Sequence, residues 1–210
     1  MKYFRLITKD IDVKPLLGEI DGQEDAWLAN TTRQDKIRVQ RETNTIFLRN
    51  AVKRPDLVIE ENQESGPTRI STRFPFAIAF MNHVAAQLKC QLSRATIVRL
   101  KPRSEVGVHI DAGSYYLIRH RFHLVLRSSC GSVLRAGDEQ VRMQEGELWW
   151  FDNKQHHSAF NESSEWRIHY IFDLLPPVYA RLAINPTPLD QLPTDIVASA
   201  LGERAPAPAL

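Results

Sequence analysis

Short runs of alternating apolar and polar residues occupy the second half of the chain, from about residue 95 to residue 175. The runs are TIVRLK, VGVHI, RFHLVLR, SVLRA, QVRM, ELWWF, HSAF and WRIHYIFDL, and turn-forming residues separate them. Short strands at such regular spacing are typical of a β-sandwich or β-barrel. The pattern therefore predicts an all-β core over residues 95–175.

The residues before this core mix strand and helix signals. A short strand is predicted at 3–7, and a second one at 37–49, after a polar stretch. The stretch PFAIAFMNHVAAQLKC begins with proline and is rich in Ala, Phe, Met and Leu, which predicts a helix at 75–90. We expect this helix to cover one side of the core.

The residues after the core predict a short helical tail. A Pro-Pro pair ends the β region, and helices are expected at 178–184 and 194–201. With 210 residues, of which 43% are hydrophobic, the chain can bury one sizeable core. We therefore expect a single domain at 1–177, with the N-terminal strands and helix packed on the β core, and a C-terminal helical extension at 178–210.

The charge of the chain gives little reason to expect a polyanionic partner. Lys plus Arg number 27 and Asp plus Glu number 25, so the formal net charge is +2. Nucleic acids and anionic membranes attract proteins with a large basic excess. We therefore expect neither nucleic acid nor membrane as a partner, and the sequence does not predict an oligomeric state.

The N-terminus and the cysteines favour a reducing, cytoplasmic setting. MKYFRLITKDIDVK meets charges at Arg5, Lys9 and Asp10 before an apolar run of signal-peptide length develops. No stretch approaches the ~20 apolar residues of a membrane span. Cys90 and Cys130 are too few for a disulfide framework and lack the spacing of a thiolate zinc site, so we expect buried free thiols.

Histidines are concentrated in the predicted β core, where six of the seven lie between His109 and His169. In VGVHIDAGS, His109 and Asp111 are two residues apart near a strand end, so both side chains are expected on one face. One imidazole and one carboxylate supply two of the three ligands of a two-histidine, one-carboxylate iron site. An ordinary strand histidine followed by a turn aspartate gives the same short pattern, and this alternative stays open on these residues alone.

The third ligand of such a site must come from another strand. In ELWWFDNKQHHSAFN a hydrophobic strand ends at Phe151, and a turn then leads to His156 and His157. Adjacent residues of a strand face opposite ways, so only one of these two histidines can be the ligand. Spacing alone does not choose between them.

An Arg-x-His pattern occurs twice within otherwise apolar runs, at Arg121 and His123 and again at Arg167 and His169. Alternation places each Arg and its His on one face of the strand and the large apolar residues on the other. A guanidinium inside a barrel is costly unless it meets a fixed anion, and Arg can bind a carboxylate through two parallel hydrogen bonds. Arg167 or Arg121 can therefore hold a dicarboxylate. A solvated outer face is the alternative for either motif alone.

Together these motifs resemble the aspartyl/asparaginyl β-hydroxylase family, in its small bacterial form similar to proline cis-4-hydroxylase. The resemblance rests on HIDAGSYYLIRHRFHLVL and GELWWFDNKQHHSAFNESSEWRIHYIFDLLP, and a weaker echo lies in TIFLRN. It covers roughly residues 95–177. The resemblance implies a double-stranded β-helix, which is the jelly-roll fold of cupin-like proteins.

The resemblance also implies a set of iron ligands. His109 and Asp111 match the proximal ligand pair of the family. His157 lies ten residues before Arg167 and matches the distal ligand better than His156 does. Asp111 completes the ligand set and leaves no vacant position for a halide, so hydroxylation is expected rather than halogenation.

The implied cosubstrate is 2-oxoglutarate. Arg167 matches the family's arginine that binds the distal carboxylate of 2-oxoglutarate, while Arg121 and His123 match the Arg-x-His that approaches it from the facing strand. The implied activity is that of an Fe(II)- and 2-oxoglutarate-dependent dioxygenase, which uses dioxygen to hydroxylate an unactivated carbon. We expect the substrate to be an amino acid or amino-acid residue, whether free, carrier-bound or in a peptide.

Two further residues are expected near the substrate. Arg99 lies ten residues before His109, as does a substrate-side arginine of the resembling proline hydroxylases, and is expected to bind a substrate carboxylate. Its alternative is a surface salt bridge. Trp150, with its neighbours Trp149 and Phe151, can line a substrate pocket, although aromatic residues of a buried strand more often belong to the core.

Two rival functions also fit the predicted barrel. One is a cupin-like module that binds a metal without turnover, and the other is a cupin enzyme that does not use 2-oxoglutarate. Neither rival gives a reason for an inward-facing Arg167. The hydroxylase interpretation is therefore the one that we carry forward.

Overall fold

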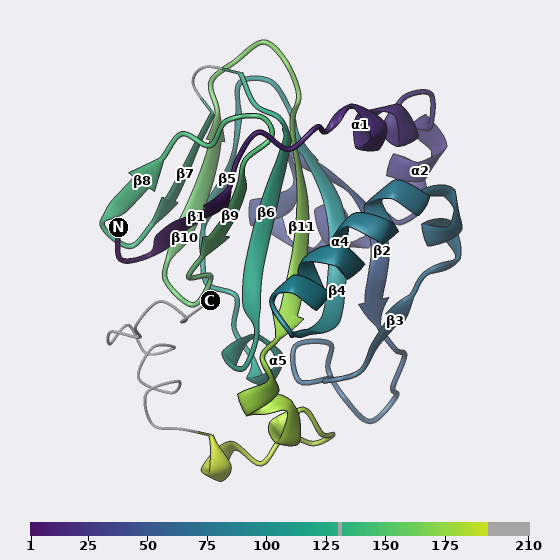
Figure 1. Cartoon of the computed structure of the whole chain (residues 1–210), viewed down its shortest axis with the longest axis vertical. Coiled ribbons are helices and arrows are strands. Elements are labelled where there is room, and N and C mark those ends of the chain that lie inside the picture. The colour runs from purple at the N-terminus through teal and green to yellow at the C-terminus, as the bar shows by residue number, and fades with distance from the viewer. Residues whose placement is uncertain (130–131, 193–210) are drawn as a thin grey trace.

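The computed structural model describes residues 1–129 and 132–192 of the chain (Figure 1). Its strands are β1 (Phe4–Thr8), β2 (Thr43–Ala51), β3 (Ser65–Pro67), β4 (Gln91–Leu100), β5 (Ser104–His109), β6 (His120–Arg127), β7 (Ser132–Ala136), β8 (Glu139–Val141), β9 (Leu148–Phe151), β10 (His157–Asn161) and β11 (Arg167–Leu175). Within the described residues they form a seven-stranded sheet in the order β1-β9-β6-β11-β4-β2-β3 and a four-stranded sheet in the order β5-β10-β7-β8. The strands of both sheets pair antiparallel, which confirms the predicted all-β jelly-roll core.

Helices flank this core, mainly at the N-terminal side of the chain. They are α1 (Lys14–Ile20), α2 (Glu24–Leu28), α3 (Thr32–Lys36), α4 (Pro75–Gln87) and α5 (Ser114–Leu117), with 3-10 helices at Arg38–Gln40, Arg69–Arg73, Pro177–Leu182 and Leu189–Gln191. Helix α4 confirms the helix predicted at 75–90 and lies across the larger sheet (Figure 1). No helix of the described residues has the length and apolar character that a membrane span requires.

Two large hydrophobic clusters fill the spaces between the layers. One lies between the sheets and joins residues of the larger sheet, such as Val125 and Phe151, to Val106 and Ala159 of the smaller one. The other lies between the larger sheet and the helices. Its largest fully buried members are Trp27, Phe74, Phe122, Tyr170 and Phe172.

Alternation along β11 sends its side chains to these two places in turn. Ile168, Tyr170 and Phe172 belong to the core under the helices, and the Tyr170 hydroxyl donates to the carbonyl oxygen of Ala77 in α4 at 3.0 Å. The polar residues between them, Arg167 and His169 among them, consequently point between the sheets. The fold therefore buries a row of ionisable side chains in the space where the two sheets face each other.

The expected strand at 37–49 was correct only from Thr43 onward. Before that point Arg38–Gln40 forms a 3-10 turn that packs on β5. Gly107 in β5 has no side chain, and a Cβ built there would lie 3.1 Å from a methyl group of Val39. The apolar-polar alternation of this segment thus reflects contact with a strand edge rather than membership of a sheet.

The tail also differs from the prediction. The helix expected at 178–184 is a 3-10 helix, Pro177–Leu182. Pro186 disfavours a helical conformation for the residue before it, so the segment cannot continue as an α-helix. The helix expected at 194–201 lies outside the described residues. Cys130 does too, whereas Cys90 is a half-buried free thiol.

Candidate metal centre

The two sheets bring His109, Asp111 and His157 together at one point. One potential ligand atom from each residue lies within 4.8 Å of the other two. His109 ends β5 and His157 begins β10, and the two are directly paired across these neighbouring strands. His157 is buried, whereas the adjacent His156 is exposed, so of this pair it is His157 that lies with His109 and Asp111.

Both histidines of the cluster are held in the same tautomer. In His109 the Nδ1 atom lies 2.9 Å from the carbonyl oxygen of Gly107, and in His157 it lies 2.9 Å from that of Gln155. Nδ1–H is therefore the donor, and Nε2 of each ring carries the lone pair that a metal would use. In His109 this Nε2 lies 3.4 Å from the side-chain amide nitrogen of Gln40, a long contact that a metal ion would replace. Burial lowers the pKa of His157 to about 4, which keeps its imidazole neutral at neutral pH.

Asp111 is oriented by the turn that follows β9. Its backbone N–H donates to the carbonyl oxygen of Asn153 at 3.2 Å, and the Asn153 amide donates to its carboxylate at 3.0 Å. Burial alone raises the pKa of the Asp111 carboxyl, but the charge of Arg121, the His157 ring and the Asn153 amide together hold that pKa well below its ordinary value. Asp111 is thus an ionised, fixed carboxylate.

The structure gives Arg121 partners other than the expected cosubstrate. Its guanidinium donates to Asp173 from Nε at 2.8 Å and from Nη2 at 3.0 Å, and its Nη1 donates to Asp111. Both carboxylates hold the pKa of Arg121 above its ordinary value despite burial. The guanidinium is neutralised by two fixed carboxylates. Arg121 therefore positions Asp111.

Arg167 is buried between the sheets without such a partner. None of the ion pairs among residues 1–129 and 132–192 includes it, and its Nη2 lies 3.2 Å from Nδ1 of His169. Burial lowers the pKa of Arg167 to about 10. A buried guanidinium that remains charged at neutral pH calls for an anion, and no carboxylate of the described chain supplies one.

His123 and His169 complete a polar chain beside Arg167. Nδ1 of His123 lies 3.1 Å from Nδ1 of His169. Because the Arg167 guanidinium can only donate, Nδ1 of His169 accepts and its Nε2 carries the proton. That Nε2–H is buried and has no hydrogen-bond partner among the described residues. The His123 ring contacts Phe151, which contacts His157, so this chain lies next to the ligand cluster.

Arg99 lies on the opposite face of the larger sheet, which corrects the expectation that it binds substrate. It pairs with Ile168, whose side chain faces the helices. Its guanidinium stacks between Trp27 and Trp166, each 4.5 Å away, and donates to both carboxylate oxygens of Glu24 at 2.9 Å. Arg99 therefore fixes helix α2 to the sheet.

Trp150 likewise belongs to the core under the helices rather than to a substrate pocket. It pairs with Phe122 across β9 and β6, and its indole N–H donates to Nδ1 of His120 at 3.3 Å. Its neighbours Trp149 and Phe151 face between the sheets. The expectation for Trp150 thus failed because β9 turns this residue to the wrong side.

A cavity of about 740 Å³ opens beside the ligand cluster. Its wall includes His109, Asp111 and Arg121, together with residues of α3 and of the segment before β3. The apolar part of the lining is Ile37, Val39, Phe47, Ile59, Ala95, Ile110, Ala112 and Ile171. The cavity is therefore large enough for a small organic molecule next to the candidate metal position.

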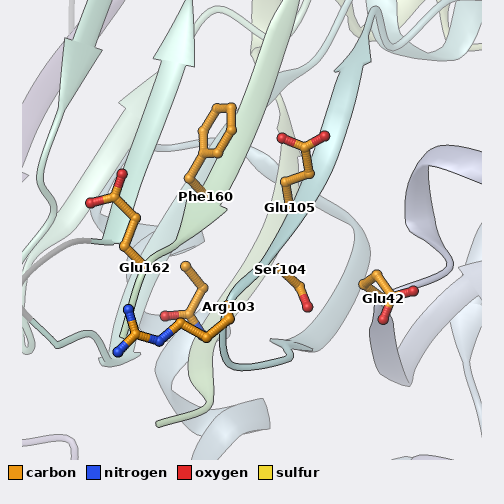
Figure 2. Close-up of a pocket in the computed structure, with 7 residues that line it drawn as sticks. Glu42, Arg103, Ser104, Glu105, Phe160 and Glu162 are labelled. Atoms are coloured by element: carbon orange, nitrogen blue, oxygen red, sulfur yellow. The ribbon is translucent and has the colours of Figure 1, made fainter. Parts of the chain in front are cut away.

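A second depression lies elsewhere on the surface (Figure 2). Charged residues around it include Glu42, Arg103, Glu105 and Glu162. None of the cluster residues lines it, and its shape is that of an open groove. The ligand cluster and its adjoining cavity are accordingly the candidate functional site.

Several residues of this site were not singled out from the sequence. Asp173 follows Arg167, His169 and Ile171 at the same two-residue spacing, so the alternation of β11 carries the signal for it. Asn153 lies in the turn between β9 and the histidine pair and has no signal of its own. The residues of α3 come from a segment in which no periodic pattern marks an inward face.

A sequence model of the aspartyl/asparaginyl beta-hydroxylase family matches residues 49–177, which is more than half of the chain. The chain belongs to this family. The match runs from the last residues of β2 through β11 and so includes every residue of the ligand cluster. This beta-hydroxylase family member has no significant match among curated protein sequences.

Three solved structures illustrate what this hydroxylase family member is similar to. A non-heme monooxygenase, ThoJ, in complex with nickel, is 13% identical over 84% of this chain and 74% of its own, with a TM-score of 0.50. A viral collagen prolyl hydroxylase from Paramecium bursaria Chlorella virus 1, in complex with 2OG, is 11% identical over 83% and 96%, with a TM-score of 0.48. A 2OG-Fe(II) oxygenase family oxidoreductase from Burkholderia pseudomallei is 14% identical over 65% and 69%, with a TM-score of 0.43. At these identities the likeness to ThoJ supports the fold alone.

Proposed function

We propose that this protein is an Fe(II)- and 2-oxoglutarate-dependent dioxygenase that hydroxylates an unactivated carbon of an amino acid or amino-acid residue. The observation that carries the proposal is the pairing of a two-histidine, one-carboxylate cluster with an interior guanidinium, Arg167, that has no carboxylate partner. The cluster alone fits several metal proteins. The unpaired arginine fits a metal centre that also binds a dicarboxylate.

The donor set fits Fe(II). His109 and His157 would bind through Nε2 and Asp111 through a carboxylate oxygen, an arrangement that leaves coordination positions open. When bound, Fe(II) and 2-oxoglutarate together activate dioxygen, so that one oxygen atom enters the substrate and the other enters succinate as carbon dioxide leaves. The protein's own contribution is to keep these ligands oriented and deprotonated.

Residues around the cluster keep the ligands in that state. The backbone carbonyl oxygens of Gly107 and Gln155 accept hydrogen bonds from the Nδ1–H groups of the two histidines and so fix both rings. Arg121 and Asn153 hold the Asp111 carboxylate ionised. Preorganised contacts of this kind strengthen metal binding and set the direction of the ligands.

Arg167 would bind the distal carboxylate of 2-oxoglutarate. The two-pronged geometry of a guanidinium matches a carboxylate, and the buried Nε2–H of His169 is a further donor without a partner among the described residues. His123 would orient His169 through the contact between their Nδ1 atoms. The substrate would occupy the cavity that His109 and Asp111 line.

The test is a measurement of succinate formed from 2-oxoglutarate with Fe(II), ascorbate and a panel of amino acids and peptides. His157→Ala should abolish both Fe(II) binding and succinate formation. His156→Ala is the matched control, because this neighbouring histidine is exposed, and it should retain both. A wild-type protein that binds Fe(II) but forms no succinate with any panel member would favour the metal-binding module instead.

A further inference from the structure

Arg33 is a cavity-lining guanidinium that the site described so far does not use. It lies in α3 and lines the cavity together with His109 and Asp111. Its side chain is half-buried and makes no hydrogen bond or ion pair with the described residues. Burial lowers the pKa of Arg33, and the smaller influences on that pKa include the charges of Arg121 and of Asp111 in the ligand cluster.

The other guanidinium groups of the cavity already have partners. Arg49 donates to the carbonyl oxygens of Ser93 and Ser65. Arg94 donates to the carbonyl oxygens of Ile59 and Asn62 and stacks on Tyr115 at 3.5 Å. Arg121 is paired with two carboxylates, as described above. Arg33 is therefore the cavity guanidinium with its donors free for a ligand, among the residues that the structure describes.

Glu60 is a solvent-exposed negative charge at the wall of the same cavity. Its backbone is fixed, because its carbonyl oxygen accepts the N–H of Tyr115 at 3.1 Å, and Gly113 packs so closely that an added Cβ would lie 2.5 Å from that oxygen. Its carboxylate has no ion-pair partner within 4.0 Å among the described residues, and Arg33 is not close enough to pair with it. The cavity thus holds this carboxylate together with two cations, the half-buried Arg33 and the exposed Lys36, and neither cation forms an ion pair with it among the described residues.

The lining of the cavity also has an apolar part, with Ile37, Ile59 and Ile110 among its members. We infer that the cavity binds a free, zwitterionic amino acid with an apolar side chain, whose carboxylate pairs with Arg33 and whose ammonium group pairs with Glu60. This inference rests on the proposed function and chooses among its substrate classes. A carrier-bound or internal peptide residue has no free carboxylate to offer Arg33.

Binding can be measured without turnover. We would titrate the twenty proteinogenic L-amino acids into the full-length protein, loaded with Fe(II) and 2-oxoglutarate under nitrogen, by calorimetry. The tightest apolar binder is then compared with its C-terminal amide on the wild type, on Arg33→Gln and on Arg38→Gln. Arg38 is an exposed residue close to α3 that does not line the cavity, so its variant controls for the loss of one positive charge.

The expected result is an affinity for the amino acid that falls about 10- to 100-fold in Arg33→Gln and is unchanged in Arg38→Gln. The amide should bind weakly and equally to the wild type and to Arg33→Gln, because the partner of Arg33 is then missing. Glu60→Gln should lower the affinity for the amino acid but not the affinity for its N-acetyl derivative. Gln has a helix propensity close to that of Arg, and the helix-ending bond from the Ile37 N–H goes to the backbone of Arg33, so the fold should persist.

Three outcomes would overturn the inference. The first is that none of the twenty amino acids binds. The second is that Arg33→Gln loses affinity for the amino acid and for its amide equally. The third is that the amide binds more tightly than the amino acid. Failure of the proposed function has a different signature, namely absence of succinate formation with every substrate class. Arg33-dependent binding of an amino acid to a protein that forms no succinate would leave the inference standing and remove the proposed function.

Discussion

The burial of Arg167 without an anion makes it a residue whose removal should separate function from stability. Arg167→Met keeps the side-chain volume and removes a desolvated charge, so the free energy of unfolding without ligand should stay equal or rise. Loss of a charge-assisted carboxylate contact should weaken the binding of 2-oxoglutarate by about 2 to 4 kcal/mol, or about 30-fold to several hundredfold in affinity. Urea unfolding and 2-oxoglutarate titration measure the two effects. A large loss of stability with unchanged cosubstrate affinity would make Arg167 structural.

Asn153 offers a test of how Asp111 is positioned. Its amide N–H donates to the Asp111 carboxylate, while its own Oδ1 is buried without a partner, so Asn153→Ala should cost little stability. Loss of an orienting contact to a metal ligand typically lowers the affinity for the metal about tenfold to 100-fold. Since this donor also helps to lower the pKa of Asp111, the loss of Fe(II) affinity in the variant should grow as the pH falls. Fe(II) titrations of wild type and variant at two pH values give the answer, and equal affinities would exclude the role.

At the scale of single residues, spacing predicted the cluster better than it predicted the substrate contacts. His109 and His157 come together because β5 and β10 pair directly, and Asp111 follows two residues after His109, just beyond the end of β5, where Asn153 holds it. The expectation for Arg99 rested on a separation of ten residues along the chain, which does not fix the face of a strand. Val98 and Leu100 point between the sheets, and Arg99, one position away from each, points to the helices.

Helix α2 is joined to the larger sheet through Arg99, which gives an element-scale prediction. Arg99→Gln removes the contacts to Trp27, Trp166 and Glu24 and should lower the free energy of unfolding by about 1 to 2 kcal/mol. Because these contacts lie on the face away from the cavity, the affinities for 2-oxoglutarate and Fe(II) should not change. Denaturant unfolding and ligand titrations check both statements, and a selective loss of substrate affinity would restore the substrate role.

The elements themselves could be predicted where periodicity is strong. Residues 95–175 alternate between two buried faces, and a strand was found at each of the predicted runs. Helices α1 to α3 were missed because each is short and has no side-chain hydrogen bond at its N-cap. Tertiary packing stabilises α1 and α2 instead, through buried side chains such as Leu16 and Trp27, whereas α3 has no buried residue. A cavity wall built from such helices is not visible in a sequence pattern.

For the whole molecule, buried neutral histidines predict loss of stability in acid. Burial, together with the charge of nearby Lys154, lowers the pKa of His120 from 6.5 to about 3. Since the unfolded chain binds the proton more readily, the stability contribution is full above pH about 6.5 and is lost as the pH falls toward 3. His123 and His169 act in the same direction.

The matching variant is His120→Gln, which can still accept the N–H of Trp150 but does not titrate. Its free energy of unfolding should fall less than that of the wild type between pH 7 and pH 4. Urea unfolding at several pH values measures this difference in slope. Parallel curves for the two proteins would mean that His120 is not a buried neutral group.

The direct pairing of His109 with His157 has a consequence for motion. β5 is an edge strand of the four-stranded sheet and is hydrogen-bonded to β10 on one side. A divalent ion held by both strands would act as a cross-link, and the strand could fray only after releasing the ion. At an ion concentration 100 times the dissociation constant, opening would cost about 2.7 kcal/mol more. Amide hydrogens of β5 would then exchange with solvent about 100-fold more slowly, so an edge that should be the loosest part of the sheet would become one of its slowest to open.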